Sequence, residues 1–206
     1  MNRPSPLVSR ADLASHTRAV LHRGRARNPD VLLVDGPHGP IVVKDFAPRS
    51  ALVRSVLGRW LNHREMRAYR RLAGHPSVPR LLGSIDAFAF ALEYRPGRRM
   101  SRRLAGTIRP GFVDRLAAAV DAMHRLGVVH LDLRHRSNVL VDERGEPVLI
   151  DFASAVVLAP GSWLARALGR VDRRAVEKWR QRVGDDVPGA AASGSSEARR
   201  GASRPT

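Results

Sequence analysis

Residues Val128–Ser154, VVHLDLRHRSNVLVDERGEPVLIDFAS, contain the most informative pattern in the chain. Two short apolar runs, Val139–Val141 and Val148–Ile150, flank the polar segment Asp142–Pro147. Gly145 lies inside that segment and can adopt the positive φ that a tight turn requires. The pattern therefore predicts a β-hairpin whose two ends lie close together.

Three oxygen-bearing side chains flank this hairpin. Asp132 and Asn138 precede its first strand, and Asp151 follows its second strand directly. Because a hairpin brings its ends together, we expect the three side chains to converge on one edge. Carboxylate and amide oxygens suit a hard cation such as Mg²⁺, which also keeps water and phosphate ligands. The alternative is a structural hairpin on which the acidic residues occur by chance.

The motif His-x-Asp-Leu at 130–133, Asn138 and Asp-Phe at 151–152 resemble the catalytic loop and metal-binding turn of the protein-kinase-like superfamily. The spacing departs from the common pattern, because five residues rather than four separate the aspartate from the asparagine. Ala153 also replaces the usual glycine after Asp-Phe. Small kinase-like proteins related to lipopolysaccharide sugar kinases and RIO-type kinases are tolerant there, so the resemblance points to that small bacterial branch.

The resemblance implies a role for each residue of this stretch. Asp132 would be the catalytic carboxylate that orients the acceptor hydroxyl. Asn138 and Asp151 would be the Mg²⁺ ligands. Arg134 occupies the place of a cation that stabilises the transferred phosphoryl group.

Earlier in the chain, Lys44 ends the apolar run Ile-Val-Val-Lys and resembles the lysine strand of kinases. Glu65 is the lone acid on the apolar stripe of a helix predicted over residues 50–73, where an unpaired carboxylate is costly. We therefore expect Glu65 to pair with Lys44, with a surface pair to a neighbouring arginine as the alternative. Gly24, in a turn between two predicted strands, would contact the nucleotide phosphates, although a solvated turn explains it equally well.

Two further segments complete the nucleotide and substrate predictions. Glu93 and Arg95 lie in the segment that resembles the linker between kinase lobes, where backbone groups would contact adenine. A cluster of arginines follows and is a candidate patch for an anionic substrate, or simply a solvated surface; it comprises Arg98, Arg99, Arg102 and Arg103.

Composition limits the remaining possibilities. The 206 residues carry a net charge of +17 and no cysteine, which excludes disulfides and thiolate metal sites. The charge favours anionic partners, but arginine-rich usage is also explained by compositional bias of the genome. With no apolar run of about 20 residues and no signal-peptide pattern at the start, we expect a cytoplasmic protein, peripheral at the inner membrane face if it binds lipid at all.

The predicted architecture is α+β, a two-lobed protein-kinase-like fold. An arm over 1–16 would precede an antiparallel N-lobe over 17–96, a reduced, mainly helical C-lobe over 97–183, and a disordered tail over 184–206. The predicted function is ATP- and Mg²⁺-dependent transfer of a phosphoryl group to a hydroxyl of a protein Ser/Thr or a lipopolysaccharide-type sugar. The alternatives are a pseudokinase that acts as a nucleotide-binding or interaction scaffold, and a basic nucleic-acid-binding protein.

Overall fold

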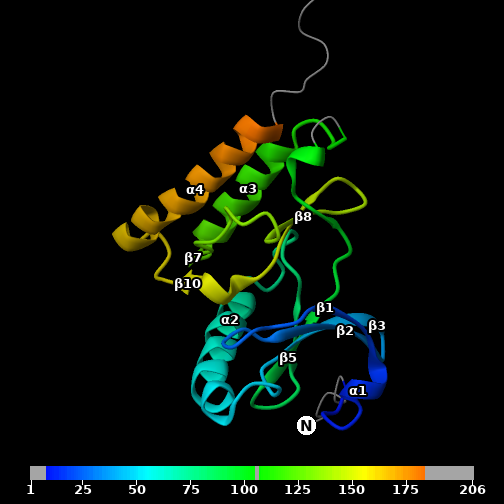
Figure 1. Cartoon of the computed structure of the whole chain (residues 1–206). Coiled ribbons are helices and arrows are strands. Elements are labelled where there is room, and N and C mark those ends of the chain that lie inside the picture. The colour runs from blue at the N-terminus through cyan, green and yellow to red at the C-terminus, as the bar shows by residue number, and fades with distance from the viewer. Residues whose placement is uncertain (1–7, 105–106, 184–206) are drawn as a thin grey trace, which may run out of the picture.

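A five-stranded antiparallel sheet and one long helix form the first half of the fold (Figure 1). The computed structural model describes residues 8–104 and 107–183. A short helix, α1 (Leu13–His16), leads into the sheet. The strands are β1 (Thr17–His22), β2 (Asp30–Gly36), β3 (Gly39–Asp45), β4 (Leu81–Ser84) and β5 (Ala89–Glu93), in the order β1-β2-β3-β5-β4.

The long helix of this half packs on the sheet at β4 and β5. It begins as a π-helical segment, η1 (Val53–Gly58), and continues as α2 (Arg59–Arg71). Gly58 lies against Phe46, and a Cβ at this position would come within 2.8 Å of the ring. Met66 and Tyr69 are buried on the inner face of α2. This packing fixes the helix, and therefore Glu65, against the sheet.

The second half is mainly helical. Two helices, α3 (Phe112–Arg125) and α4 (Trp163–Val183), pack together at the upper end of Figure 1. The short elements around them are β6 (Arg98–Arg99), η2 (Arg102–Leu104), β7 (Val128–Val129), β8 (Val139–Val141), β9 (Pro147–Leu149), η3 (Phe152–Ser154) and β10 (Val156–Val157). Strands β8 and β9 form the predicted hairpin, which β6 extends, and β7 pairs with β10.

One hydrophobic core connects the two halves. It includes Phe90 from the sheet, Tyr69 from α2, Met123 from α3 and Trp179 from α4, all almost fully buried. The predicted α+β class is confirmed, with an antiparallel sheet in the first half and a mainly helical second half. Within the described residues, no helix is both long and apolar enough to cross a bilayer.

Two local features were not evident from the sequence. Residues 8–16 are not a loose arm, because the guanidinium of Arg10 binds Asp45 at 2.7 Å and Asp86 at 2.6 Å. Helix α4 continues through Gly169; a Cβ there would lie 3.1 Å from the ring of His124, so the glycine permits close packing of α3 and α4. The expected disordered tail, 184–206, lies outside the described residues.

A buried histidine in the loop after α2 makes stability depend on pH. His75 Nδ1 accepts a hydrogen bond from the Ser77 amide, and Nε2 lies 3.1 Å from the Ala119 carbonyl oxygen, so the neutral ring satisfies both partners. Burial lowers the pKa of His75 from its ordinary value of 6.5. The unfolded chain therefore binds a proton that the folded chain excludes, and this stabilisation is present above about pH 6.5 and lost as pH falls.

We expect the stability difference between wild type and His75→Gln to shrink by up to about 1.4 kcal/mol per pH unit below pH 6.5. Urea unfolding at several pH values measures the difference. His38→Gln, at an exposed histidine, is the control and should give a difference that is independent of pH. A constant difference for both variants would contradict this account of His75.

Candidate functional site

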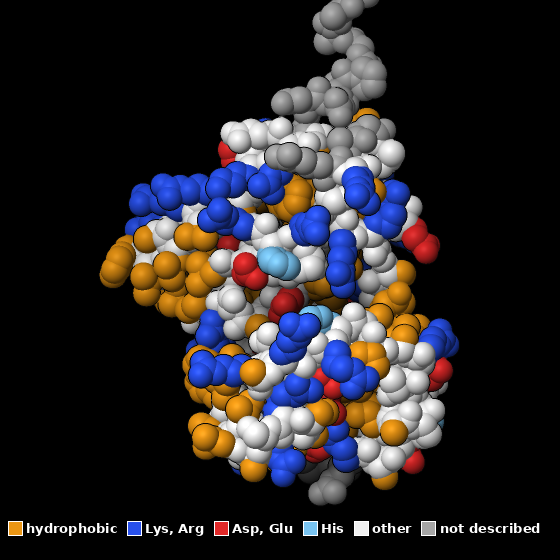
Figure 2. Space-filling model, in the orientation of Figure 1, with side chains coloured by type: hydrophobic (Ala, Val, Ile, Leu, Met, Phe, Trp, Pro, Cys, Tyr) orange, Lys and Arg blue, Asp and Glu red, His pale blue; other side chains and the backbone are white. Residues whose placement is uncertain are grey.

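Lys44 connects three elements that are distant in the sequence. From β3 its Nζ lies 2.6 Å from Oε1 of Glu65 on α2 and 2.7 Å from Oδ1 of Asp151 after β9. The side chains of Lys44 and Glu65 are only 8% and 4% exposed, whereas that of Asp151 is 46% exposed. The lysine is therefore held inside the protein while one carboxylate opens to solvent. Figure 2 shows acidic side chains at the waist between the two halves.

The charges of this triad depend on each other. Burial disfavours the ammonium of Lys44, but Glu65 and Asp151 outweigh it and raise the lysine pKa above its ordinary value. The positive charge of Lys44 in turn lowers the pKa of Asp151, against the effect of burial. The ammonium and the Asp151 carboxylate are consequently both charged at neutral pH, as a phosphate- and metal-binding pair requires.

The loop before β8 brings Asp132 and Asn138 into direct contact. The Asn138 amide nitrogen donates to Asp132 Oδ2 at 2.9 Å and to the Asp132 carbonyl oxygen at 3.0 Å. Two successive turns accommodate the additional residue of the loop, since the His135 amide bonds to Asp132 and the Asn138 amide bonds to His135. The amide nitrogen of Asn138 thus faces Asp132, and its oxygen remains on the other side, where Ser137 donates to it.

Backbone bonds hold this loop beside the Asp151 turn. The Ile150 amide donates to the carbonyl oxygen of Asn138, and His130 Nε2 lies 3.1 Å from the carbonyl oxygen of Ile150. The His130 ring also packs on Phe152, with ring centroids 4.6 Å apart. Burial lowers the pKa of His130, although the charge of Asp172 and the hydrogen bond to Ile150 oppose this effect. His130 is therefore a buried histidine whose ring contacts the backbone of Asp132 on one side and of Ile150 on the other.

The backbone of the site is strained at two non-glycine residues. Leu131 has φ 67° and Asp151 has φ 65°. Such left-handed conformations cost of order 1 kcal/mol and persist where the surrounding structure imposes them. At Asp151 the constraint comes from Lys44 on one side and from buried Phe152 on the other.

Asp172 on α4 imposes the conformation at Leu131, and sequence reasoning missed this residue. It is completely buried and accepts hydrogen bonds from the His130 amide and the Leu131 amide, each at 2.8 Å. His124 Nε2 lies 3.0 Å from the same carboxylate. A signal was available, because Asp172 is the lone acid on the buried face of α4, where its neighbours are Ala165, Gly169, Val176 and Trp179.

The structure gives three other predicted residues internal contacts. The Gly24 amide donates to Asp30 Oδ1 at 2.8 Å, and a Cβ there would overlap the carbonyl oxygens of Asn28 and Pro29. Gly24 therefore serves loop closure, and its amide is not free for a phosphate. Glu93 lies at the end of β5 and binds the Arg80 amide, and the Arg95 side chain binds the Pro76 carbonyl oxygen. These contacts direct both side chains to neighbouring backbone groups rather than to Lys44 and Asp151.

The predicted arginines lie at the surface. Arg134 is exposed two residues after Asp132, and no hydrogen bond or salt bridge to it occurs among the described residues. Arg98 and Arg99 are exposed on β6, and Arg103 is exposed in η2. The side chain of Arg102 lies outside the described residues.

The donor set at this site fits Mg²⁺. The carboxylate of Asp151 is half exposed, and the oxygen of Asn138 faces away from Asp132. The described residues contain no group of three or more His, Cys, Asp or Glu that would enclose a metal. Two protein oxygens, with water and phosphate in the remaining positions, match the way Mg²⁺ is bound beside nucleotides.

Comparisons with known proteins agree with this geometry. No family model matches the sequence. The chain is 36% identical over 100 residues to CBL-interacting protein kinase 12 of Oryza sativa subsp. japonica. The matched stretch covers 45% of this chain and 18% of that protein. It is 33% identical over 115 residues to the serine/threonine-protein kinase PknK of Mycobacterium tuberculosis (strain H37Rv), covering 50% of this chain and 10% of that protein. The chain thus spans less than a fifth of the length of these relatives.

A solved structure resembles most of the chain. The crystal structure of the Rio2 kinase from Chaetomium thermophilum matches with a TM-score of 0.58 at 18% identity, over 85% of this chain and 62% of that chain. At this identity the match concerns the fold, while the local similarity to protein kinases comes from the sequence. The chain therefore has a protein-kinase-like fold, and up to half of its length is similar in sequence to protein kinases.

Proposed function

We propose that the chain is an ATP- and Mg²⁺-dependent phosphotransferase that moves the γ-phosphoryl group to a hydroxyl of an acceptor. The observation that carries the proposal is the position of Lys44, whose ammonium contacts Glu65 and Asp151 at once. An ammonium carries three N–H donors, so one remains for a phosphate oxygen. The proposed acceptors are a protein Ser/Thr or a lipopolysaccharide-type sugar, as in the small bacterial branch that the motifs resemble.

Each residue of the site has a separate role in the proposed reaction. Mg²⁺, held through Asp151 and Asn138, would neutralise phosphate charge. Asp132 accepts the proton of the acceptor hydroxyl as the new O–P bond forms, while the bond from the γ-phosphorus to the bridging oxygen breaks and ADP keeps the electron pair. The Asn138 amide donates a hydrogen bond to Oδ2 of Asp132 and so orients this carboxylate. Arg134 adds positive charge beside the loop.

A pseudokinase is the second candidate, and Gly24 favours it. The amide of this residue is bonded to Asp30, so the loop between β1 and β2 presents fewer free donors to a phosphate chain. A chain of this kind would bind nucleotide weakly and transfer nothing. The intact contacts among Lys44, Glu65 and Asp151 favour the active enzyme instead.

Transfer of labelled γ-phosphate from Mg·ATP distinguishes the two candidates. The purified chain is incubated with three acceptor classes: Ser/Thr peptides, a glycolipid with free sugar hydroxyls, and small polyols. We expect label on one class, and we expect Asp151→Asn to reduce it to background. Glu177→Gln, at an exposed acid of α4, is the control and should retain full transfer. Thermal stabilisation by Mg·ATP without label on any acceptor would favour the pseudokinase.

A further inference from the structure

The outer face of the η1–α2 helix carries an exposed apolar ridge. Leu52, Val56 and Trp60 are 75%, 64% and 56% exposed. They recur every four residues, so they lie one above another along a single face. A single exposed leucine is ordinary, but three large apolar side chains on consecutive turns form a continuous patch.

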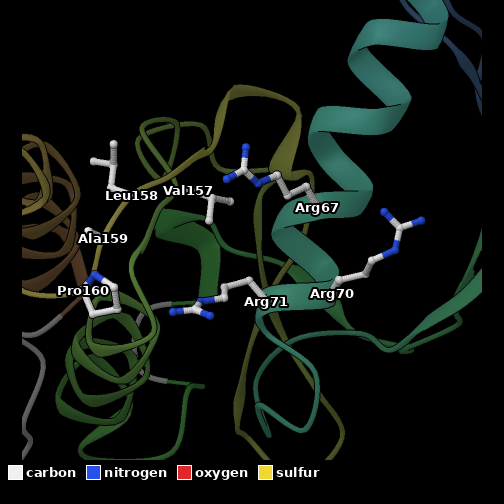
Figure 3. A pocket seen from close by; sticks show the side chains of 7 residues that line it. All are labelled: Arg67, Arg70, Arg71, Val157, Leu158, Ala159 and Pro160. Carbon is white, nitrogen blue, oxygen red and sulfur yellow. The ribbon is translucent and has the colours of Figure 1, made fainter.

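The same helix becomes strongly basic toward its C-terminus. Arg67, Arg70 and Arg71 line, with Val157–Pro160, an open hollow of about 510 Å³. Figure 3 shows Arg67 and Arg71 extending from α2 toward the Val157–Pro160 segment, while Arg70 extends to the other side. Arg71 Nε donates to the Leu126 carbonyl oxygen at 2.8 Å, which fixes the side chain. The two terminal nitrogens of the guanidinium remain available to bind an anion.

No acidic side chain balances these arginines among the described residues. None of the salt bridges there involves Arg67, Arg70 or Arg71. Residues 46–85 contain one acid, Glu65, which is buried, and residues 152–171 contain none. This region therefore presents positive charge without internal compensation.

Exposed aromatic side chains border the hollow. Trp163 follows its wall by three residues and is 73% exposed, and Leu164 beside it is 37% exposed. On the other side, the Arg64 guanidinium lies 5.2 Å from the centre of the Trp60 ring. In Figure 2, orange and blue side chains lie together along the left edge, over the start of α4 and over α2. Exposed tryptophan beside arginine is the chemistry of a membrane interface.

We propose that this face docks the protein on an anionic lipid bilayer. Arg67 and Arg71 bind lipid phosphates, and Trp60, Trp163 and Leu52 enter the boundary between headgroups and acyl chains. A lipid surface supplies both the negative charge and the apolar phase that this face lacks. A nucleic acid supplies only the charge and would leave the ridge in water. The proposal does not depend on phosphoryl transfer.

Vesicle sedimentation of the full chain tests the charge component. We expect binding to vesicles of phosphatidylcholine with phosphatidylglycerol, and little binding to phosphatidylcholine alone. The double variant Arg67→Gln/Arg71→Gln should lower the partition coefficient about 30-fold, since each arginine near an anionic surface contributes about 1 kcal/mol, or roughly fivefold. The matched control is Arg25→Gln/Arg27→Gln, an exposed pair in the loop between β1 and β2. Equal loss in both double variants would mean attraction by net charge alone and would overturn the docking face.

Tryptophan fluorescence tests the apolar component separately. The chain has three tryptophans, and Trp179 is buried, so a change on vesicle addition reports Trp60 and Trp163. We expect a blue shift and quenching by brominated acyl chains, both reduced in Trp60→Ser and in Trp163→Ser. Binding without quenching would refute insertion of the ridge. Failure to bind vesicles that contain phosphatidylglycerol would refute the proposal. Circular dichroism melting verifies that each variant folds.

Discussion

Replacement of Asp132 by asparagine is expected to lower the rate of phosphoryl transfer about 10²–10⁴-fold, the usual contribution of a general base. The substitution keeps the size of the side chain and an oxygen that can accept the hydrogen bond from Asn138, which now binds Oδ2 at 2.9 Å. What it removes is the charge that accepts the acceptor proton. Nucleotide affinity should change little, because Lys44 and Asp151 are unaffected.

Initial rates of label transfer, together with titration of a fluorescent nucleotide, measure the two quantities separately. Asp35→Asn is the control, since Asp35 is an exposed acid on β2 that binds Arg18 at the surface. It should retain both the rate and the affinity. Undiminished turnover in Asp132→Asn would remove the catalytic assignment. Loss of nucleotide affinity together with turnover would place the residue in binding rather than in proton transfer.

Much of this site can be predicted from the sequence because its constraints are local. The β8–β9 hairpin follows from two apolar runs and a turn glycine. Glu65 is conspicuous because a carboxylate on a buried helical stripe requires a partner, and the structure has Lys44 at 2.6 Å. In both cases a short window of sequence contains the pattern and its physical reason.

Other contacts could not be predicted because their partners are set by the assembled fold. Arg10 binds Asp45 and Asp86, which are 35 and 76 residues away in the chain. Among so many arginines, no local pattern distinguishes the one that closes such a pair. Gly24 illustrates the reverse problem: the sequence suggests a free loop amide, and only the folded loop reveals that Asp30 occupies it.

Asp172 is the residue whose removal should destabilise the fold most. We expect Asp172→Ala to lower the free energy of unfolding by about 3–5 kcal/mol, because it leaves the amides of His130 and Leu131 buried without an acceptor. Asp172→Asn keeps the shape but turns an N–H group toward one of these donors, so a loss of about 2 kcal/mol is expected. Denaturant unfolding measures both values.

The matched control is Glu177→Ala on the same helix. The Glu177 side chain is 59% exposed, and its one ion pair, to Arg180, is long at 3.7 Å. The free energy of unfolding of this variant should therefore change by less than about 0.5 kcal/mol.

A second measurement separates global from local effects. Leu131 has φ 67°, and the Asp172 carboxylate holds it in that conformation. In Asp172→Asn, hydrogen exchange at the His130 and Leu131 amides should therefore accelerate more than hydrogen exchange at the amides of the β2–β3 hairpin. Equal acceleration in both places would mean that Asp172 supports only the overall fold. Selective acceleration would mean that α4 holds the backbone from which Asp132 extends, so the catalytic carboxylate is positioned by a helix that begins 31 residues further along the chain.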